Sequence, residues 1–137
     1  MNTSAAVIIE KLKQAKASGD PNSFRALLAE DFTFHTPRFF KPVKDHDHFI
    51  AIMTGIFQML PDFEWTRIWP SEHEIIMEFK GHVNGGKIVA HGIDLFEFND
   101  EGKIHTLSVL LRPMSALEAI AEGEDKLIAE LLGQAKV

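Results

Sequence analysis

The sequence of 137 residues contains no cysteine and no tyrosine. Without cysteine there is no disulfide and no thiol chemistry, and without tyrosine no phenol can serve as an acid or hydrogen-bond donor. Runs of Lys and Arg are also missing, and the formal net charge is −6. Because proteins that bind nucleic acid usually carry a basic patch, these features argue against a nucleic-acid partner.

Long apolar runs are absent as well. No segment approaches the roughly 20 apolar residues of a membrane-spanning helix, and the start, MNTSAAVIIEKLKQ, lacks the basic and apolar parts of a signal peptide. We therefore expect a cytoplasmic protein without a membrane partner. No phosphate-binding loop or glycine-rich dinucleotide motif occurs, so no cofactor is expected. Without repeats or linkers, residues 1–137 are expected to form one domain.

Hydrophobic residues make up 45% of the chain and include eleven Phe and two Trp, which suffices for a core. Near both ends and in the middle, apolar residues recur at helical spacing. Asp20 before Pro21 and Asp45 are typical N-cap residues at which helices begin. Helices are predicted over 4–17, 21–30, 45–60 and 114–135, the last weakened at Gly123.

Alternating or β-rich segments separate these helices. Strands are predicted over 31–36, 38–41, 63–69, 74–83, 87–98 and 103–112. The last four follow one another as an antiparallel meander. This order predicts an α+β fold in which helices cover one face of a curved antiparallel sheet.

The stretch HGIDLFEF places one carboxylate, Asp94, inside an otherwise apolar strand. The preceding NGGK (84–87) favours a two-residue turn in which both glycines supply positive φ angles. That register puts Met77 opposite Asp94, on a sheet face that is otherwise apolar. A four-residue loop at NDEG would place Leu107 beside Asp94 on its other side.

The opposite face of the same strands mixes charged and apolar residues. It is too polar for a core and too apolar for a face that only meets solvent. A contact between two copies of the chain would explain it. The residues on this face are Ile76, Glu78, Lys80, His82, His91, Ile93, Leu95 and Glu97.

Asp94 is thus a single acid on the face that the helices should cover. Desolvation there penalises the charged form and raises the pKa, and an unpaired buried charge would cost several kcal/mol. The carboxyl group must therefore be protonated, paired or open to a pocket that admits water. Pairing with Arg67 or Arg112 would make Asp94 structural, whereas a pocket would make it functional.

Three motifs carry a resemblance that covers nearly the whole chain: LAEDFTFHTP (28–37), GIDLFEFNDEGKI (92–104) and LLRP (110–113). The chain resembles the SnoaL-like branch of the nuclear transport factor two-like superfamily. The resemblance implies a cone in which the sheet wraps around helices and encloses an internal pocket. It also implies a homodimer through the open sheet face. The superfamily includes isomerases, cyclases, hydrolases and non-enzymatic binding domains, so it leaves the function open.

Ketosteroid isomerase, a member of this superfamily, uses a base Asp, a Tyr and a protonated Asp. By this resemblance Asp94 matches the protonated Asp, Thr36 stands in the place of the base, and the Tyr would lie near Leu12. Two of the three groups are missing, which argues against ketosteroid isomerase activity. SnoaL-like polyketide cyclases use an Asp on this strand as general acid/base, which keeps acid/base chemistry open for Asp94.

Thr36 and His35 complete the candidate catalytic set with Asp94. Alternation puts His35 on the face opposite Phe34 and Thr36, so it could assist Asp94 only if Pro37 turns it inward. The alternative is a histidine that bonds to backbone or solvent. The expected pocket wall consists of Phe34, Trp65, Ile75, Met77, Phe79, Phe96 and Leu107.

Two other patterns concern a metal site and the two tryptophans. DHDH (45–48) contains metal-ligand residue types, but residues two apart on a helix do not share a face, and Asp45 is interpreted as an N-cap. No metal site is expected. Trp65 and Trp69 alternate with Phe63, so both are predicted on one strand face in the core, and Trp65 could also line an aromatic pocket wall.

Two main functions, and a third that a dimer would exclude, follow from these observations. One is a small acid/base enzyme, an isomerase, cyclase or hydrolase, that acts on a small apolar molecule with Asp94 as general acid/base. The other is a non-catalytic module for ligand binding or dimerisation. A third, partner binding through the polar sheet face, would be excluded by a dimer that covers that face.

Overall fold

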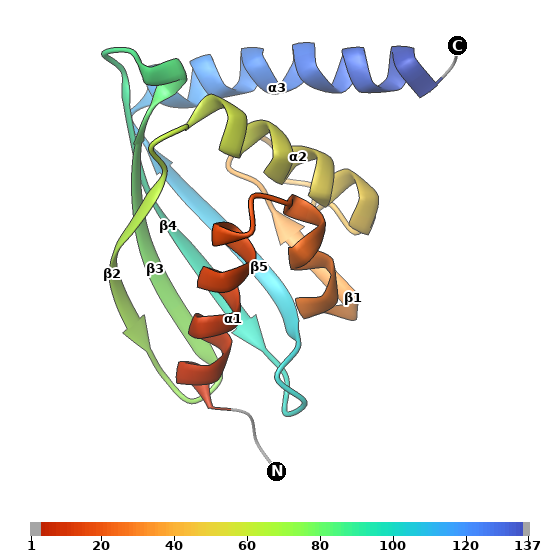
Figure 1. The fold of residues 1–137 in the computed structure, drawn as a ribbon, viewed down its shortest axis with the longest axis vertical. Coiled ribbons are helices and arrows are strands. Elements are labelled where there is room, and N and C mark those ends of the chain that lie inside the picture. Colours follow the sequence, from red (N-terminus) through yellow and green to blue (C-terminus); the bar gives the residue numbers. More distant parts are fainter. Residues whose placement is uncertain (1–3, 136–137) are drawn as a thin grey trace.

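The computed structural model describes residues 4–135, with side chains described up to residue 130 (Figure 1). The fold is α+β, as predicted. The α-helices are α1 (Ala5–Ala17), α2 (His46–Met59) and α3 (Met114–Ala135), and the 3-10 helices are η1 (Pro21–Leu27) and η2 (Val83–Gly85). The strands are β1 (Leu28–His35), β2 (Glu64–Pro70), β3 (Glu74–His82), β4 (Val89–Phe98) and β5 (Ile104–Arg112).

Both predicted N-caps are present. The carboxylate of Asp20 accepts a backbone N–H at 3.0 Å, and that of Asp45 accepts two at 2.8 and 3.2 Å. These bonds satisfy N–H groups that a helix start leaves unpaired. The segment after Asp20 is shorter than predicted and is a 3-10 helix, because the chain enters the sheet at Leu28, which pairs with Ile104.

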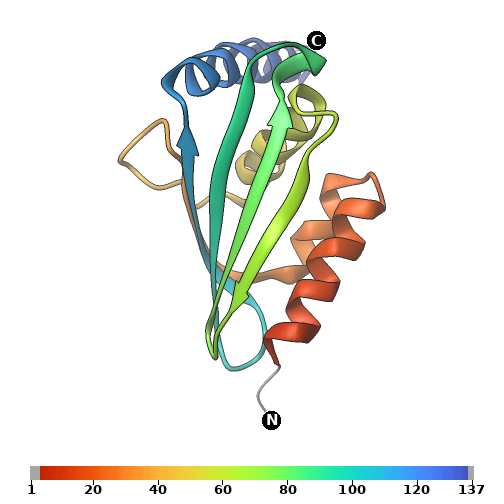
Figure 2. The same cartoon turned by 90° about the vertical axis from the view of Figure 1, so that its left-hand side faces the viewer.

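The five strands form one mixed sheet in the order β1-β5-β4-β3-β2. β2 to β5 make the predicted antiparallel meander, whereas β1 joins β5 in parallel. The sheet curves around the helices, which lie on its concave side (Figure 1). None of the described helices covers its outer face (Figure 2).

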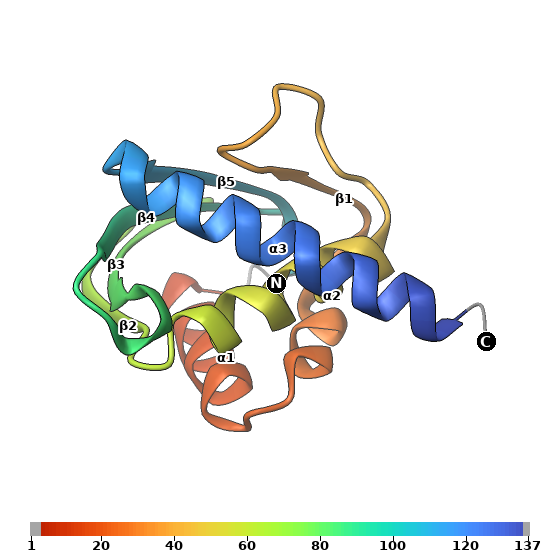
Figure 3. The same cartoon turned by 90° about the horizontal axis from the view of Figure 1, so that it is seen from above.

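The prediction of a strand over 38–41 was wrong. β1 lies at the edge of the sheet, and the chain then leaves it in a loop that projects from the body (Figure 3). Only Val43 returns, bonding to Phe34 through two backbone hydrogen bonds of 2.8 Å. The loop residues between them have no neighbouring strand to pair with in the described structure.

The β3–β4 register is the predicted one, with Met77 opposite Asp94. The turn differs in detail from the prediction. Its positive φ angles occur at Asn84 (54°) and Gly85 (70°), whereas Gly86 has a φ of −90°. The turn therefore begins one residue earlier than predicted, because Asn also tolerates the left-handed region.

The predicted position of Leu107 beside Asp94 was wrong by two residues. Asp94 pairs with Val109, and Leu107 pairs with Phe96. Phe98 pairs with Ile104, so the loop is one residue longer than predicted, and a β-bulge between Glu97 and Phe98 leaves His105 of β5 as a second extra residue. Because the error is two residues, the same side chains still face inward.

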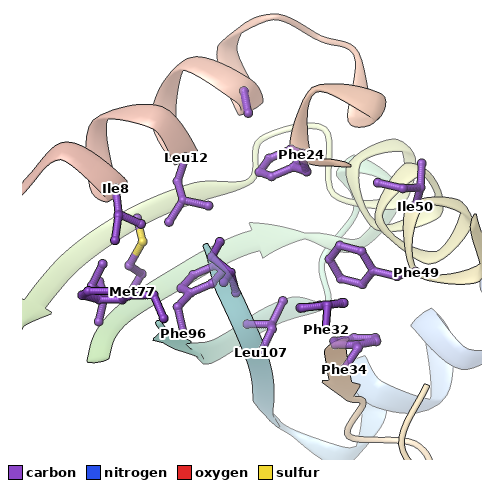
Figure 4. Close-up of a cluster of buried hydrophobic side chains, with 14 of the residues drawn as sticks. Ile8, Leu12, Phe24, Phe32, Phe34, Phe49, Ile50, Met77, Phe96 and Leu107 are labelled. Carbon is purple, nitrogen blue, oxygen red and sulfur yellow. The ribbon is translucent and has the colours of Figure 1, made fainter. Parts of the chain in front are cut away.

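Aromatic side chains form much of the core under the helices (Figure 4). Phe32 and Phe34 of β1 meet Phe49 of α2, with ring centroids 4.7 and 5.1 Å away. On the same inner face, but farther from β1, Ile8 of α1 lies beside Met77 of β3 (Figure 4). The two halves of the inner face are thus covered by different helices.

Helix α3 crosses the wide end of the cone (Figures 1 and 3). It continues through Gly123, where the sequence predicted a weak point. A Cβ at Gly123 would lie 2.2 Å from the sulfur of Met59, so the glycine lets α2 and α3 approach closely. Neither α3 nor any other described helix combines the length and the apolar character needed to cross a membrane.

The outer sheet face is organised around one buried carboxylate, Glu78. It accepts hydrogen bonds from Thr66 Oγ1 at 2.6 Å and from Arg67 Nε at 2.8 Å, and His91 Nε2 lies 2.9 Å away. These donors hold the pKa of the Glu78 carboxyl well below its usual range. Of the residues predicted on this face, Glu78 and His91 therefore contact each other, and Arg67 and Thr66 of β2 complete the group.

Gly92 of β4 marks a point where the sheet admits no side chain. A Cβ there would lie 2.2 Å from the carbonyl oxygen of Leu110 and 2.6 Å from the ring of Phe79. We expect Gly92→Ala to lower the free energy of unfolding by about 3 kcal/mol, because the backbone must shift. Urea denaturation measures this change.

Gly86→Ala provides the control for this prediction. Gly86 has a negative φ, and its nearest atom is 3.3 Å from the added Cβ. Its effect should stay below about 1 kcal/mol. Equal losses in the two variants would contradict the steric account of Gly92.

Candidate active site

An apolar cavity lies between the inner sheet face, α2, α3 and the first residues after β1. The space open to the centres of water-sized spheres is ≈ 60 Å³. Since one water needs about 10–15 Å³ by this measure, the cavity holds a few waters or a small organic group. Among the lining residues that the structure describes, four carry a charge or a hydroxyl group: Thr36, Arg38, Asp94 and Glu124.

Asp94 enters the cavity from β4, a strand between β3 and β5. Alternation along β4 turns it inward together with Phe96, and its side of the sheet is the one that the helices cover. The residue is 8% exposed. Neither Arg67 nor Arg112 reaches it, because Arg67 bonds to Glu78 on the outer face and Arg112 lies against His91. The structural ion pair that the sequence left open is therefore not formed.

Trp65 of β2 supplies the one hydrogen bond to Asp94 from the described residues. Its Nε1–H donates to Asp94 Oδ2 at 2.9 Å. The register of β2 shifts between Trp65 and Arg67, so that Thr66 is an extra residue in a bulge. Trp69 consequently lies on the outer face, and the prediction that it shares a face with Trp65 was wrong.

The second carboxyl oxygen of Asp94, Oδ1, is open to the cavity. No described residue bonds to it, and among the described side chains no fully enclosed nitrogen or oxygen lacks a partner. Oδ1 must therefore be accessible, and Asp94 lines the cavity. One oxygen of the carboxyl group is fixed by Trp65, and the other is free to meet a ligand.

Burial raises the pKa of Asp94 to about 7, and the hydrogen bond from Trp65 opposes this rise. Near neutral pH, protonated and ionised forms are therefore both populated. A carboxyl group in this state can donate a proton or accept one, which is the requirement for a general acid/base.

The other candidate catalytic residues lie in different places. Thr36 lines the cavity, and its Oγ1 accepts the backbone N–H of Arg38 at 3.2 Å. His35 is exposed on the other side of β1 and does not line the cavity. The following Pro37 does not turn His35 inward, so the structure does not bring it to Asp94.

Five of the seven residues predicted as pocket wall line the cavity. Ile75 and Met77 do not, although both are fully buried on the predicted face. They lie at the part of β3 that α1 covers, so their side chains are used in packing. The five that line the cavity are Phe34, Trp65, Phe79, Phe96 and Leu107.

An ion pair that the sequence did not predict lies in the cavity wall. Arg38 Nη1 donates to Glu124 Oε2 at 3.0 Å, and Arg38 Nη2 donates to Asp125 Oδ1 at 2.9 Å. Burial raises the pKa of Glu124, while Arg38 opposes the rise. The available signal was the position of Glu124, which follows Leu117 and Ile120 on one face of α3.

No group of three or more metal-ligating side chains is found within the described part of the chain. The interpretation of Asp45 as an N-cap is confirmed by its two backbone hydrogen bonds. His46 instead contacts the edge of Phe32, with ring centroids 6.0 Å apart. The DHDH segment is thus used in starting and packing a helix.

Residues 9–106 match the family model of the SnoaL-like domain. The chain belongs to the SnoaL-like family. No curated protein matches this SnoaL-like chain. Solved structures do, and they include proteins with NTF2-like and cystatin-like folds. The predicted superfamily is thereby confirmed.

Three of these structures illustrate the range of sequence identity to this chain. A steroid delta-isomerase from Pseudomonas aeruginosa is 28% identical, with a TM-score of 0.86 and 94% of each chain covered. An uncharacterized protein with a cystatin-like fold from Silicibacter pomeroyi DSS-3 is also 28% identical, with a TM-score of 0.81 and coverage of 94% of this chain and 88% of that one. An NTF2-like protein of unknown function from Cytophaga hutchinsonii ATCC 33406 shares the fold at 15% identity, with a TM-score of 0.61 and coverage of 80% and 91%.

The raised pKa of Asp94 makes the stability of this SnoaL-like protein depend on pH. Below about pH 4 both the folded and unfolded states hold the proton, so burial of the carboxyl carries no ionisation penalty. Between the ordinary value of 3.8 and about 7 the unfolded state ionises first, and stability is lost as pH rises. The loss levels off above pH 7 at about 4 kcal/mol.

Asp94→Asn should remove this dependence, because its amide does not ionise and its oxygen can still accept the Trp65 N–H. Relative to the unmodified protein, the variant should gain stability steadily from pH 4 to pH 7 and no further above it. Urea denaturation at a series of pH values measures the difference. A difference that does not change with pH would mean that Asp94 ionises normally in the fold.

Proposed function

We propose that this chain is an acid/base enzyme that acts on a small apolar molecule in the cavity, with Asp94 as its general acid/base. One observation carries the proposal: Asp94 has one oxygen fixed by Trp65 and the other open to an apolar cavity. Such an acid can donate a hydrogen bond or proton to a carbonyl oxygen of the ligand. The apolar wall would hold the rest of the molecule.

Proton-transfer isomerisation is the first reaction class to test. The similarity to a protein named steroid delta-isomerase supports this choice. The cavity argues against a steroid as the ligand, because ≈ 60 Å³ is small beside the ~300–1,000 Å³ of typical ligand pockets. We therefore propose a small β,γ-unsaturated ketone or a similar compound as the substrate class.

The test uses 3-cyclohexen-1-one, whose conversion to the conjugated 2-cyclohexen-1-one is followed by ultraviolet absorbance. We expect turnover by the unmodified protein and a ~10²–10⁴-fold lower kcat/KM for Asp94→Asn, since proton transfer typically contributes that factor. A Δ5-3-ketosteroid should react far more slowly because of its size. Equal rates for Asp94→Asn and the unmodified protein would contradict the role of Asp94.

The alternative is a non-catalytic module that binds a small ligand. The specific observation in its favour is that Thr36, a residue without a basic side chain, lines the cavity where related isomerases would hold a base. In that case 3-cyclohexen-1-one would bind without reacting, and Asp94→Asn would change only its affinity. Turnover by the unmodified protein would exclude this alternative.

We further propose that a second copy of the chain covers the outer sheet face, as the resemblance to the family implies. Trp69, Ile93 and Leu110 are exposed there, and Leu110 is 60% exposed. Ile93 and Leu110 are direct neighbours on adjacent strands, so their side chains form a small apolar strip. Exposed apolar strips bordered by polar groups are typical of protein interfaces.

Sedimentation velocity tests this second proposal. The unmodified protein should sediment as a species of twice 15.4 kDa, and Leu110→Glu should be a monomer because a charge would be buried in the contact. Val7→Glu places the same charge on an exposed residue of α1 and should remain a dimer. A monomeric unmodified protein at micromolar concentration would contradict the proposal.

A further inference from the structure

Glu124 occupies a position in α3 where an apolar residue would be expected. Leu117, Ile120 and Glu124 follow at spacings of three and four, so they share one face of the helix. All three line the cavity, and Glu124 is only 5% exposed. A charged residue in an apolar stripe is costly in stability unless it is paired or used.

Arg38 pairs with Glu124 but satisfies only one of its oxygens. Arg38 Nη1 donates to Oε2, while its other terminal nitrogen, Nη2, donates to the exposed Asp125. No described residue bonds to Glu124 Oε1, and no fully enclosed oxygen among the described side chains lacks a partner. Oε1 is therefore accessible, just as Oδ1 of Asp94 is.

Fastening the loop after β1 to α3 does not by itself require Glu124. Asp125 already holds Arg38 at the surface, where a carboxylate has little desolvation to overcome. Burying a second carboxylate beside the same guanidinium group adds a desolvation penalty that an ion pair often fails to recover. A structural role alone therefore does not explain why Glu124 is buried.

The two acids of the cavity have different surroundings. Asp94 has no charged partner, and its burial raises its pKa to about 7, which keeps it partly protonated. Burial raises the pKa of Glu124 as well, but Arg38, 3.0 Å away, opposes this rise because it favours the ionised form. A carboxyl group without a charged partner and a second one beside a cation have surroundings that push their pKa values apart, as an acid and a base in one site require.

We propose that Glu124 is the base of this cavity, which accepts a proton from the ligand through Oε1, and that Arg38 positions it. This inference rests on the proposed function and names the group that Thr36 cannot supply. The ligand would be a small apolar carbonyl compound with an acidic C–H, its oxygen toward Asp94 on the sheet and that C–H toward Glu124 on α3.

The proposed step balances without a cofactor. Glu124 Oε1 takes a proton from the carbon next to the carbonyl group, and the electron pair of that C–H bond moves into the forming enolate. The protonated Asp94 donates a hydrogen bond to the enolate oxygen. Glu124 then returns its proton to the γ carbon, so one C–H bond breaks, another forms, and both acids regain their starting states.

The experiment follows 3-cyclohexen-1-one in D₂O by proton NMR, which reports loss of the α protons as well as the conjugated product. Glu124→Gln keeps the size of the side chain and an oxygen that can accept from Arg38, but removes the base. We expect both rates to fall by ~10²–10⁴-fold. Glu122→Gln, the same change at an exposed position of α3, should keep both rates within about 3-fold of the unmodified protein.

The outcomes separate this inference from the proposed function. Rates within 3-fold for Glu124→Gln, together with a large loss for Asp94→Asn, would overturn the role of Glu124 and leave the proposed function intact. No exchange and no product with the unmodified protein would overturn both. If Glu124→Gln does not fold, Glu124→Asp is tested in its place. This variant keeps the negative charge beside Arg38 but shortens the side chain. Exchange of the α protons at the rate of the unmodified protein would then overturn the inference.

Discussion

The burial of one carboxyl group, Asp94, among aromatic and aliphatic side chains is the constraint on which the site depends. Desolvation penalises its charged form, and a single neutral donor, the Trp65 N–H, opposes that penalty. A second strong donor or a nearby cation would keep the carboxyl ionised at neutral pH. The absence of such a group among the described neighbours brings its pKa to about 7, where it can exchange a proton with a ligand.

The sheet keeps a cationic partner away from Asp94 because its two buried acids lie on opposite faces. Glu78 of β3 and Asp94 of β4 are close along the sheet, since Glu78 pairs with Ile93, yet they point to opposite sides. Arg67 and Thr66 both reach Glu78, because the bulge in β2 places both of them on the outer face. The same bulge leaves Trp65 pointing inward to Asp94. One extra residue in β2 thus directs the cationic partner away from the cavity and the neutral donor into it.

The sequence predicted the part of the site that local patterns determine. The NGGK turn and strand alternation placed Asp94 opposite Met77 on the covered face, which the structure confirms. The partner of Asp94 was not predictable from those patterns, because a one-residue bulge at Thr66 leaves no mark in the spacing of apolar residues. Ile75 and Met77 were assigned to the pocket because alternation gives the face of a residue but not which helix covers it. The contact of Arg38 with Glu124 joins residues 86 apart in sequence, and only the packing of α3 against the loop after β1 reveals it.

The most direct test is a titration of the Asp94 carboxyl carbon by carbon-13 NMR, with the resonance assigned by its loss in Asp94→Asn. We expect a midpoint near pH 7, which would show an acid held half-protonated by desolvation. Trp65→Phe should move the midpoint still higher, because it removes the one hydrogen bond that favours the charged form. A midpoint at or below the reference value of ~3.9 would contradict the account, since Asp94 would then be a solvated or ion-paired carboxylate.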